Sequence, residues 1–247
     1  MFLLDLIFPK RCVSCGRIGA YLCKVCQRKI VTIDSPVCPL CQRQAIGGKT
    51  HPGCVKRYGL DGLIVASRYS GPVKIAIAKI KYRWIYDICS VLIDILAANI
   101  WRFDLPKNYI LVPVPLHARR KNWRGFNQAE LLVEILAKKF SVSHADLLVR
   151  TVNTGTQVSL DRDQRRKNVK GAFAIRGSTP EGLSPDLGVE PLKTTFRQAQ
   201  INYFDVVGKN VILVDDVYTS GATMAECAKV LKRAGAKSVW GMAVALG

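Results

Sequence analysis

The sequence lacks a hydrophobic run long enough to cross a membrane. A membrane-spanning helix needs about 20 mostly apolar residues, and the longest apolar stretch, Ile85–Trp101, contains Asp87 and Asp94. Its apolar positions instead recur on one helical face, which predicts a helix packed on a core: Ile85, Ile88, Cys89, Leu92 and Leu96. The opening residues MFLLDLIF are too short for a signal-peptide core and include Asp5. We therefore expect a cytoplasmic protein without stable membrane insertion.

Acidic residues are scarce relative to basic ones. Among 247 residues there are 18 Asp and Glu against 37 Lys and Arg, which leaves a formal net charge of +19. This balance suits a polyanionic partner such as nucleic acid, a nucleotide or pyrophosphate. Apolar residues make up 49% of the chain and charged residues 22%, so the composition excludes a wholly disordered protein.

Cysteine is rare outside the N-terminal segment. Only Cys89 and Cys227 lie beyond residue 54, both in apolar, helix-like patterns, and we expect both to be core residues. The other seven of the nine cysteines fall within the first 54 residues, and six of them form three C-x2-C pairs. In a reducing compartment such pairs favour zinc sites over a disulfide framework.

The spacing predicts two structural zinc sites with four ligands each. The first set is C-x2-C-x7-C-x2-C: Cys12, Cys15, Cys23 and Cys26. The second is C-x2-C-x9-H-x2-C: Cys38, Cys41, His51 and Cys54. An exchanged pairing, with Cys12 and Cys15 sharing an ion with Cys38 and Cys41, remains open. Neither set leaves an open coordination position, and metal would supply much of the folding energy of so small a module.

From about residue 61 the pattern predicts alternating strands and helices. The expected strands are 62–69, 109–114, 209–215 and 238–245, and the expected helices are 128–139 and 222–234. A strand, a helix and a strand in succession form a βαβ unit, which predicts an α/β fold with a parallel sheet. Residues 177–200 lack any period, which indicates a mobile insertion. The expected domains are a double zinc-ribbon module at 1–60 and an α/β domain at 61–247.

The sharpest chemical signal is the segment 211–223, V-I-L-V-D-D-V-Y-T-S-G-A-T. A buried strand brings Asp215 and Asp216 to the carboxyl edge of the sheet, where ligands of open α/β folds bind. The next residues offer hydroxyl groups and the amides at the start of a helix, where the dipole favours an anion. Adjacent carboxylates suit sugar hydroxyls or a magnesium ion. The segment therefore predicts a site for a phosphorylated ribose, although a generic strand–turn–helix is the alternative.

This segment and several others resemble known families. Residues 211–223 are similar to the 5-phosphoribosyl-1-pyrophosphate (PRPP) signature of type I phosphoribosyltransferases, with Tyr218 at a usually aliphatic position. The whole chain resembles the ComF family of competence-associated proteins, in which a double zinc ribbon precedes a phosphoribosyltransferase domain. Four further segments carry this resemblance: L-L-D-L-I-F-P at 3–9, R-Y-G-L-D-G-L at 57–63, V-P-V-P-L-H at 112–117 and R-G-F-N-Q-A-E at 124–130.

The resemblance implies roles for particular residues. Asp215 and Asp216 would be the catalytic acids. PRPP with its Mg²⁺ would be bound by a second set: Tyr218, Thr219, Ser220, Gly221, Ala222, Thr223, Arg119 and Arg124. A flexible loop at 157–170 would close over the reacting centre, with Arg162, Arg165, Arg166 and Asn168. Each basic segment taken alone is better explained as a solvated charge run, and function is favoured only because the PRPP-like segment stands beside it. His117 is equally well explained as a phosphate ligand or as a turn residue.

Two functions follow from the resemblance. In the first, the protein transfers phosphoribosyl from PRPP to a nitrogen acceptor that the sequence does not identify. In the second, it is a non-catalytic accessory protein that binds single-stranded DNA beside a DNA-uptake translocase and keeps the loop for ligand binding. Five aromatic residues offer stacking surfaces, although their helical spacing is more typical of a core: Tyr82, Trp84, Tyr86, Trp101 and Trp123.

Overall fold

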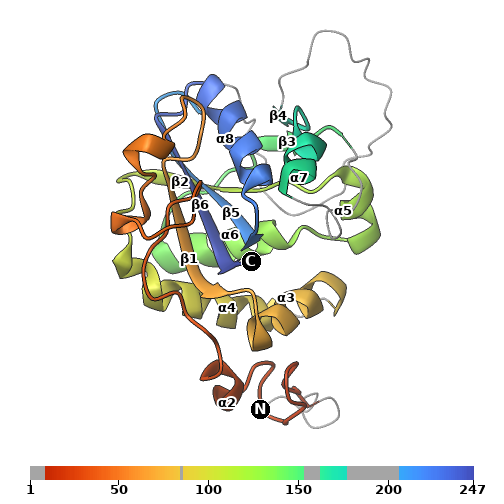
Figure 1. Ribbon diagram of the computed structural model, residues 1–247. Helices are drawn as coiled ribbons and strands as arrows, with labels where there is room; N and C mark the ends of the chain where they lie inside the picture. Colours follow the sequence, from red (N-terminus) through yellow and green to blue (C-terminus); the bar gives the residue numbers. More distant parts are fainter. Residues whose placement is uncertain (1–8, 84–85, 153–161, 177–205) are drawn as a thin grey trace.

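The computed structural model describes residues 9–83, 86–152, 162–176 and 206–247 (Figure 1). The insertion expected at 177–200 and the first part of the expected flexible loop lie outside these residues. Within the described part, no helix has both the length and the apolar character needed to cross a membrane.

A four-stranded parallel sheet forms the centre of the molecule. Its strand order is β1-β6-β5-β2, with β1 at Gly62–Arg68, β6 at Ser238–Leu246, β5 at Asn210–Tyr218 and β2 at Tyr109–Pro113. All neighbouring strands run parallel. The predicted α/β fold with a parallel sheet is therefore confirmed. β5 continues to Tyr218, three residues beyond the expected end, because its ladder with β6 extends to the pair Tyr218–Leu246.

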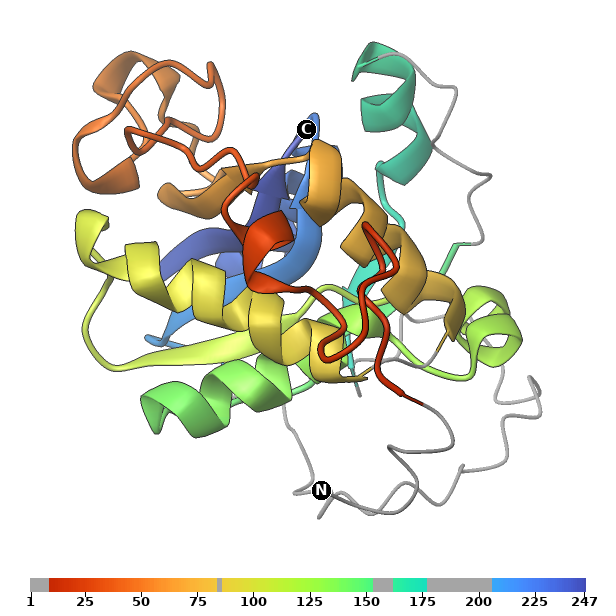
Figure 2. The ribbon, with the colours of Figure 1, turned by 90° about the horizontal axis from the view of Figure 1, so that it is seen from below.

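Helices cover both faces of the sheet (Figures 1 and 2). On one face lie α3 at Gly71–Arg83, α4 at Tyr86–Asn99 and α6 at Gln128–Phe140. On the other face lies α8 at Ala222–Arg233, which packs against α7 at Arg162–Val169 and against a small antiparallel pair, β3 at Leu148–Arg150 and β4 at Phe173–Ile175. Short elements complete the chain: α2 at Lys24–Gln27, α5 at Ala118–Arg124, and 3-10 turns at Ile46–Gly48, Pro52–Cys54 and Ile100–Arg102.

The expected core-packed helix is confirmed by α4. Ile88, Cys89 and Leu92 are fully buried on its inner face. Cys227 is likewise fully buried on α8, so both cysteines beyond residue 54 are core residues as expected. Burial raises the pKa of the Cys89 thiol to about 12, which keeps it protonated and inert.

The two N-terminal ribbons lie at different places on this framework. Residues 31–33, which connect them, run antiparallel beside the free edge of β1, where the Ile33 amide donates to the Ala66 carbonyl at 3.0 Å. The first ribbon has a small apolar cluster of its own, with Val91 of α4 packed against it. The first ribbon also packs the partly buried Val13, Tyr21 and Ile30 on the core of the α4 side, whereas the second ribbon contributes the buried Val37 to the main core on the α8 side. Figures 1 and 2 both show the red first ribbon well separated from the orange second one.

Candidate functional site

The structure gathers the predicted metal ligands into two groups. One holds Cys12, Cys15, Cys23 and Cys26, and the other holds Cys38, Cys41, His51 and Cys54. Within each group the four ligand atoms lie within 4.8 Å of one another. The predicted pairing is therefore confirmed, and the exchanged pairing is wrong. Four sulfurs, or three sulfurs and an imidazole, form the donor sets of closed, structural zinc sites.

The first cysteine pair of each group sits in the same backbone turn. In both turns, the amide of the leading cysteine, Cys12 or Cys38, donates to the carbonyl five residues later, at 2.8–2.9 Å. Its carbonyl accepts from the amide four residues later, again at 2.8–2.9 Å. That fourth residue is left-handed in both, with φ of 77° at Gly16 and 57° at Gln42. The repeated spacing thus folds into a repeated structure, with glycine in one copy and glutamine in the other.

Backbone amides prepare these turns for metal. Burial opposes ionisation of Cys12, but amides that include those of Cys23 and Cys15 lower its pKa to about 6. In the same way, and against burial, the amides of Cys41 and His51 lower the pKa of Cys38 to about 7. Since zinc binds the thiolate, these amides favour the ligand form.

His51 is oriented as a ligand through its Nδ1 atom. Nε2 lies 2.8 Å from the carbonyl of Gln44, so Nε2 carries the proton and donates it there. Nδ1, with its free lone pair, lies 3.3 Å from Cys41 Sγ in the second group. A carbonyl that fixes the tautomer of a ligating histidine is a usual companion of zinc sites.

The predicted catalytic acids lie near the carboxyl end of β5. Asp215 helps to raise the pKa of Cys227 on α8, whereas Asp216 helps to raise that of Cys89 on α4, in both cases after the larger effect of burial. The two carboxylates therefore face opposite sides of the sheet, as the alternation of a strand requires. Asp216 is 6% exposed. A single sugar can contact both carboxylates only if it lies across the carboxyl edge of the sheet.

The predicted ligand loop, Thr219–Thr223, joins β5 to α8. Gly221 is the N-cap of α8 with φ of 72°, a conformation that favours glycine. A Cβ atom at Gly221 would overlap the phenol of Tyr218 directly beneath it. The first turn of α8 carries no acidic residue. Backbone amides at a helix start without acids are a typical anion-binding arrangement, and the predicted role of this loop stays a prediction.

The Tyr218 side chain is buried between the loop and the second ribbon. It is 3% exposed, and its hydroxyl donates to the carbonyl of Pro39 in the second ribbon at 2.8 Å. The next residue is held in a similar way, since Gln42 Nε2 donates to the Thr219 carbonyl at 3.0 Å. The aromatic residue at the usually aliphatic position is therefore a tether to the zinc ribbon.

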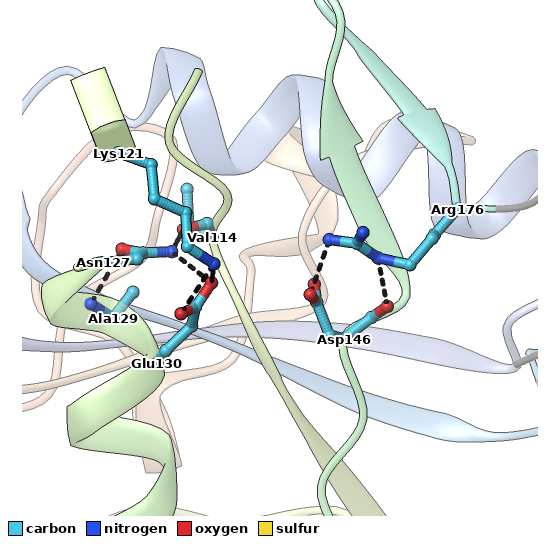
Figure 3. Close-up of polar contacts among 7 residues, drawn as sticks. All are labelled: Val114, Lys121, Asn127, Ala129, Glu130, Asp146 and Arg176. Atoms are coloured by element: carbon cyan, nitrogen blue, oxygen red, sulfur yellow. Dashed lines mark hydrogen bonds and ion pairs between the residues drawn. The ribbon is translucent and has the colours of Figure 1, made fainter. Parts of the chain in front are cut away.

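The basic segment after β2 forms the short helix α5 instead of a loop. His117 caps it, with Nδ1 accepting from the Arg119 amide at 3.2 Å, which favours the turn role for this histidine. Lys121 pairs with Glu130 at 2.7 Å (Figure 3). Asn127 donates to the Val114 carbonyl at 3.1 Å and accepts from the Ala129 amide at 3.0 Å. The R-G-F-N-Q-A-E segment thus fastens the end of β2 to the start of α6.

Some cations of this segment are bonded to neighbouring side chains, and others are exposed to solvent. Lys121 is engaged by Glu130, and Arg124 donates to Gln128 at 3.3 Å. Arg119 is exposed, whereas Arg120 is half-buried. Burial has the largest effect in lowering the pKa of Arg150, and the nearby Arg120 lowers it further. Of the predicted pair, Arg119 is therefore the more available to an anion and Arg124 is partly engaged.

Arg150 was missed by sequence reasoning. It ends β3 and is 7% exposed, with its guanidinium 5.4 Å from the centre of the Phe173 ring. Burial lowers its pKa most, Arg120 lowers it further, and Asp215 opposes the shift. The pKa of His117 is lowered mainly by burial and, to a smaller extent, by the positive charges of Arg150, Arg120 and Arg119. A buried arginine close to an acid and to other cations is a candidate for holding an anion. The one signal was a charged residue ending the apolar run L-L-V-R.

A basic hollow of about 510 Å³ lies beside the ligand loop. Its walls come from the second ribbon, the 56–60 segment, the end of α7 and the start of α8. Its cations are Lys56, Arg57, Arg166, Lys170 and Lys229. Glu226, the single acid of the lining, accepts from the Gly171 amide at 3.0 Å and pairs with Lys229 at 3.2 Å.

The residues predicted for the flexible loop lie on α7. Arg162, Arg165, Arg166 and Asn168 all fall within Arg162–Val169. Among them Arg166 lines the hollow, and Asn168 is half-buried on α7. Two aromatic residues expected in the core are exposed instead, Trp101 at 77% and Trp123 at 72%.

Comparisons with known proteins agree with this architecture. Residues 3–55 match the double zinc ribbon domain, and residues 127–246 match the phosphoribosyl transferase domain. The chain is similar to competence protein F of Haemophilus influenzae, at 30% identity over 96% of this chain and 97% of the relative. It is also similar to the DNA utilization protein YhgH of Escherichia coli K12, at 29% identity over 88% of this chain and 87% of the relative.

A third relative, competence protein ComFC of Bacillus subtilis, is 26% identical over 87% of this chain and 79% of its own length. The likeness thus spans both modules, and the ligand loop lies inside the matched phosphoribosyl transferase domain. From the two domain matches and the near full-length likeness, the chain belongs to the ComF family of competence-associated proteins.

Proposed function

We propose that this protein binds PRPP with Mg²⁺ at the carboxyl edge of its sheet and transfers the phosphoribosyl group to a nitrogen acceptor. The observation that carries the proposal is the loop between β5 and α8. It combines a left-handed Gly221, a helix start without acids and two carboxylates at the end of the preceding strand.

Each part of PRPP has a chemically matched group on this edge. The amides and hydroxyls of Thr219–Thr223 would hold the 5′-phosphate, and Asp215 and Asp216 the ribose hydroxyls. Arg119, Arg124 and Arg150 would hold the pyrophosphate. Magnesium bound to the pyrophosphate would neutralise charge on the leaving group.

In the reaction, the bond from C1 of the ribose to pyrophosphate breaks and a bond from C1 to the acceptor nitrogen forms. The chain's contribution is to orient the ribose, to stabilise charge on the departing pyrophosphate and to keep water from C1. The basic hollow beside the loop is the space that we assign to the acceptor. A cytoplasmic location is part of this proposal, because clustered cysteine ligands stay reduced and available to zinc in a reducing compartment.

Calorimetric titration of PRPP with Mg²⁺ tests the site. Loss of a charge-assisted hydrogen bond costs about 1.5–3 kcal/mol, so Asp215→Asn and Asp216→Asn should each weaken binding roughly 10–100-fold. Asp94→Asn is the control, because Asp94 pairs with Lys139 on the surface, away from the loop. Unchanged affinity in both test variants would remove the assignment. A screen of nucleobases and amines for pyrophosphate release then tests transfer.

A second candidate function, single-stranded DNA binding without turnover, is favoured by the basic hollow and by exposed Trp123 on basic α5. Two relatives carry the names competence protein and one the name DNA utilization protein. Backbone binding by Lys and Arg should weaken steeply with salt, and an exposed indole can stack on a base. Oligonucleotide titrations at several salt concentrations measure this, and no binding at low salt would eliminate it.

A further inference from the structure

Two hydrogen bonds join the second zinc ribbon to the ligand loop. Tyr218, the last residue of β5, donates from its hydroxyl to the carbonyl of Pro39 at 2.8 Å. Gln42 donates from Nε2 to the carbonyl of Thr219 at 3.0 Å. Pro39 lies between the ligands Cys38 and Cys41, and Gln42 directly follows Cys41. The metal turn of the ribbon therefore contacts two consecutive residues at the start of the loop.

This contact is buried and closely fitted. The Tyr218 side chain is 3% exposed, and Pro39 and Cys38 are buried beside it. The backbone of Gly221 lies directly on the Tyr218 phenol, with no room for a Cβ atom. A shift of Pro39 would therefore move the Tyr218 ring, and with it the backbone that presents amides to an anion.

The backbone at Gln42 gives independent support. It is left-handed, with φ of 57°, a region that a residue other than glycine enters at a cost. The equivalent residue of the first ribbon is Gly16, which enters this region freely. A glutamine at this position is explained by its side chain, whose amide reaches the loop.

The first ribbon has no comparable link in the described part of the chain. Its ties run to the opposite side of the sheet, where Val91 packs on it and Lys10 pairs with Asp87 of α4 at 2.7 Å. The two metal groups have the same turn and different neighbours, which makes the first group a matched control for the second.

We propose that the second zinc ribbon positions the ligand loop, and that Tyr218 and Gln42 are the positioning residues. Metal in the Cys38–Cys54 group holds Pro39 and Gln42 in place, and through them residues 218 to 221. Loss of that metal then weakens PRPP binding, whereas loss of metal from the first group does not. The affinity part of this inference rests on the proposed function, but the ordering of the loop does not.

The test compares ligand variants of the two groups in the full chain. Cys54→Ser and Cys15→Ser each remove one metal ligand that is not buried. For both variants we measure zinc content, PRPP affinity and hydrogen exchange of the amides at 219–223. We expect Cys54→Ser to weaken PRPP binding about ten-fold or more, since structural metal supplies much of the folding free energy of such modules. We expect faster amide exchange at 219–223 in Cys54→Ser alone. In Cys15→Ser, PRPP affinity and amide exchange at 219–223 should both stay within two-fold of the wild type.

Two further variants keep the test decisive if Cys54→Ser does not fold. Tyr218→Phe removes the hydroxyl and keeps the ring beneath Gly221. Gln42→Gly removes the amide and relieves the left-handed backbone, so it should leave thermal stability almost unchanged. Each variant loses one hydrogen bond between the ribbon and the loop, so each should weaken PRPP binding about five-fold. Each should still bind about two zinc ions per chain. A fall in affinity without a fall in stability is not expected of a merely structural residue.

The outcomes separate this inference from the proposed function. Wild-type affinity and wild-type exchange in Tyr218→Phe and Gln42→Gly would overturn the inference, and so would equal damage from Cys15→Ser and Cys54→Ser. If the wild-type protein binds no PRPP, the proposed function fails, and exchange at 219–223 still decides whether the second ribbon orders the loop.

Discussion

The two zinc ribbons have the same metal turn but different surroundings. The first keeps a small apolar cluster of its own and rests on α4, with Cys15 exposed to solvent. The second adds Val37 to the main core, buries Cys38 completely and contacts the loop at the end of β5. Local sequence spacing sets the metal geometry, whereas the role of each site depends on what packs around it.

The largest predicted difference concerns folding. Cys12 and Cys38 occupy the same place in the two turns and are both buried. Cys38→Ser should lower the main thermal transition, because Val37 beside it belongs to the main core. A loss of about 3 kcal/mol would lower the midpoint by roughly 6–12 °C in a domain of this size. Cys12→Ser should lower that transition less, because the first ribbon places only partly buried side chains on the core: Val13, Tyr21 and Ile30. Calorimetry with zinc analysis measures both, and equal losses would remove the distinction between the ribbons.

The next prediction concerns charge at the ligand edge. Arg150→Met keeps most of the buried volume and removes one of the cations that we propose for pyrophosphate, so PRPP affinity should fall about 10–100-fold. Thermal stability is measured beside affinity, because loss of Arg150 leaves the nearby Asp215 with one cation fewer and so costs folding free energy. Arg176→Met is the control, since Arg176 forms a surface pair with Asp146 (Figure 3). Equal affinity in the two variants would remove Arg150 from the site.

A smaller effect is expected from pH. Burial and the nearby Arg150, Arg120 and Arg119 lower the pKa of His117 in the folded state. The unfolded chain therefore binds the proton more readily, and stability falls as pH drops through about 6.5 towards the lowered folded value. His117→Asn keeps a capping acceptor and removes this titration. Its thermal midpoint should change less than that of the wild type between about pH 8 and pH 5.5, and parallel curves would contradict the assignment.

The smallest prediction concerns the attachment of the first ribbon. Lys10 and Asp87 form an exposed ion pair, which is worth about 0–1 kcal/mol. Asp87→Asn should therefore leave the main thermal transition and PRPP affinity unchanged. Limited proteolysis of residues 9–30 should become slightly faster. A large fall in PRPP affinity would mean that the first ribbon also supports the ligand site.

The sequence was sufficient for features set by neighbouring residues. Spacing alone predicts both ligand sets, and apolar periodicity predicts α4, α6 and α8. The flexible loop expected at 157–170 is helical at Arg162–Val169, and the basic segment after β2 forms α5. Arg, Lys and Gln are good helix formers, and His117 and Gly125 cap α5, so charge density was a poor guide to backbone there.

Features that depend on distant contacts could not be predicted in the same way. The bond from Tyr218 to Pro39 spans 179 positions, and the bond from Gln42 to Thr219 spans 177. No local pattern encodes either. Arg150 is similar, because its meaning depends on Asp215 and Arg120, which come from other strands and helices.

The most direct test of the central claim follows the backbone amides of the protein by NMR as PRPP and Mg²⁺ are added. We expect the largest shift changes at residues 219–223, with smaller ones at Gln42 and Arg150 and none in residues 9–30. Saturable binding that moves other amides and leaves 219–223 unshifted would contradict the claim.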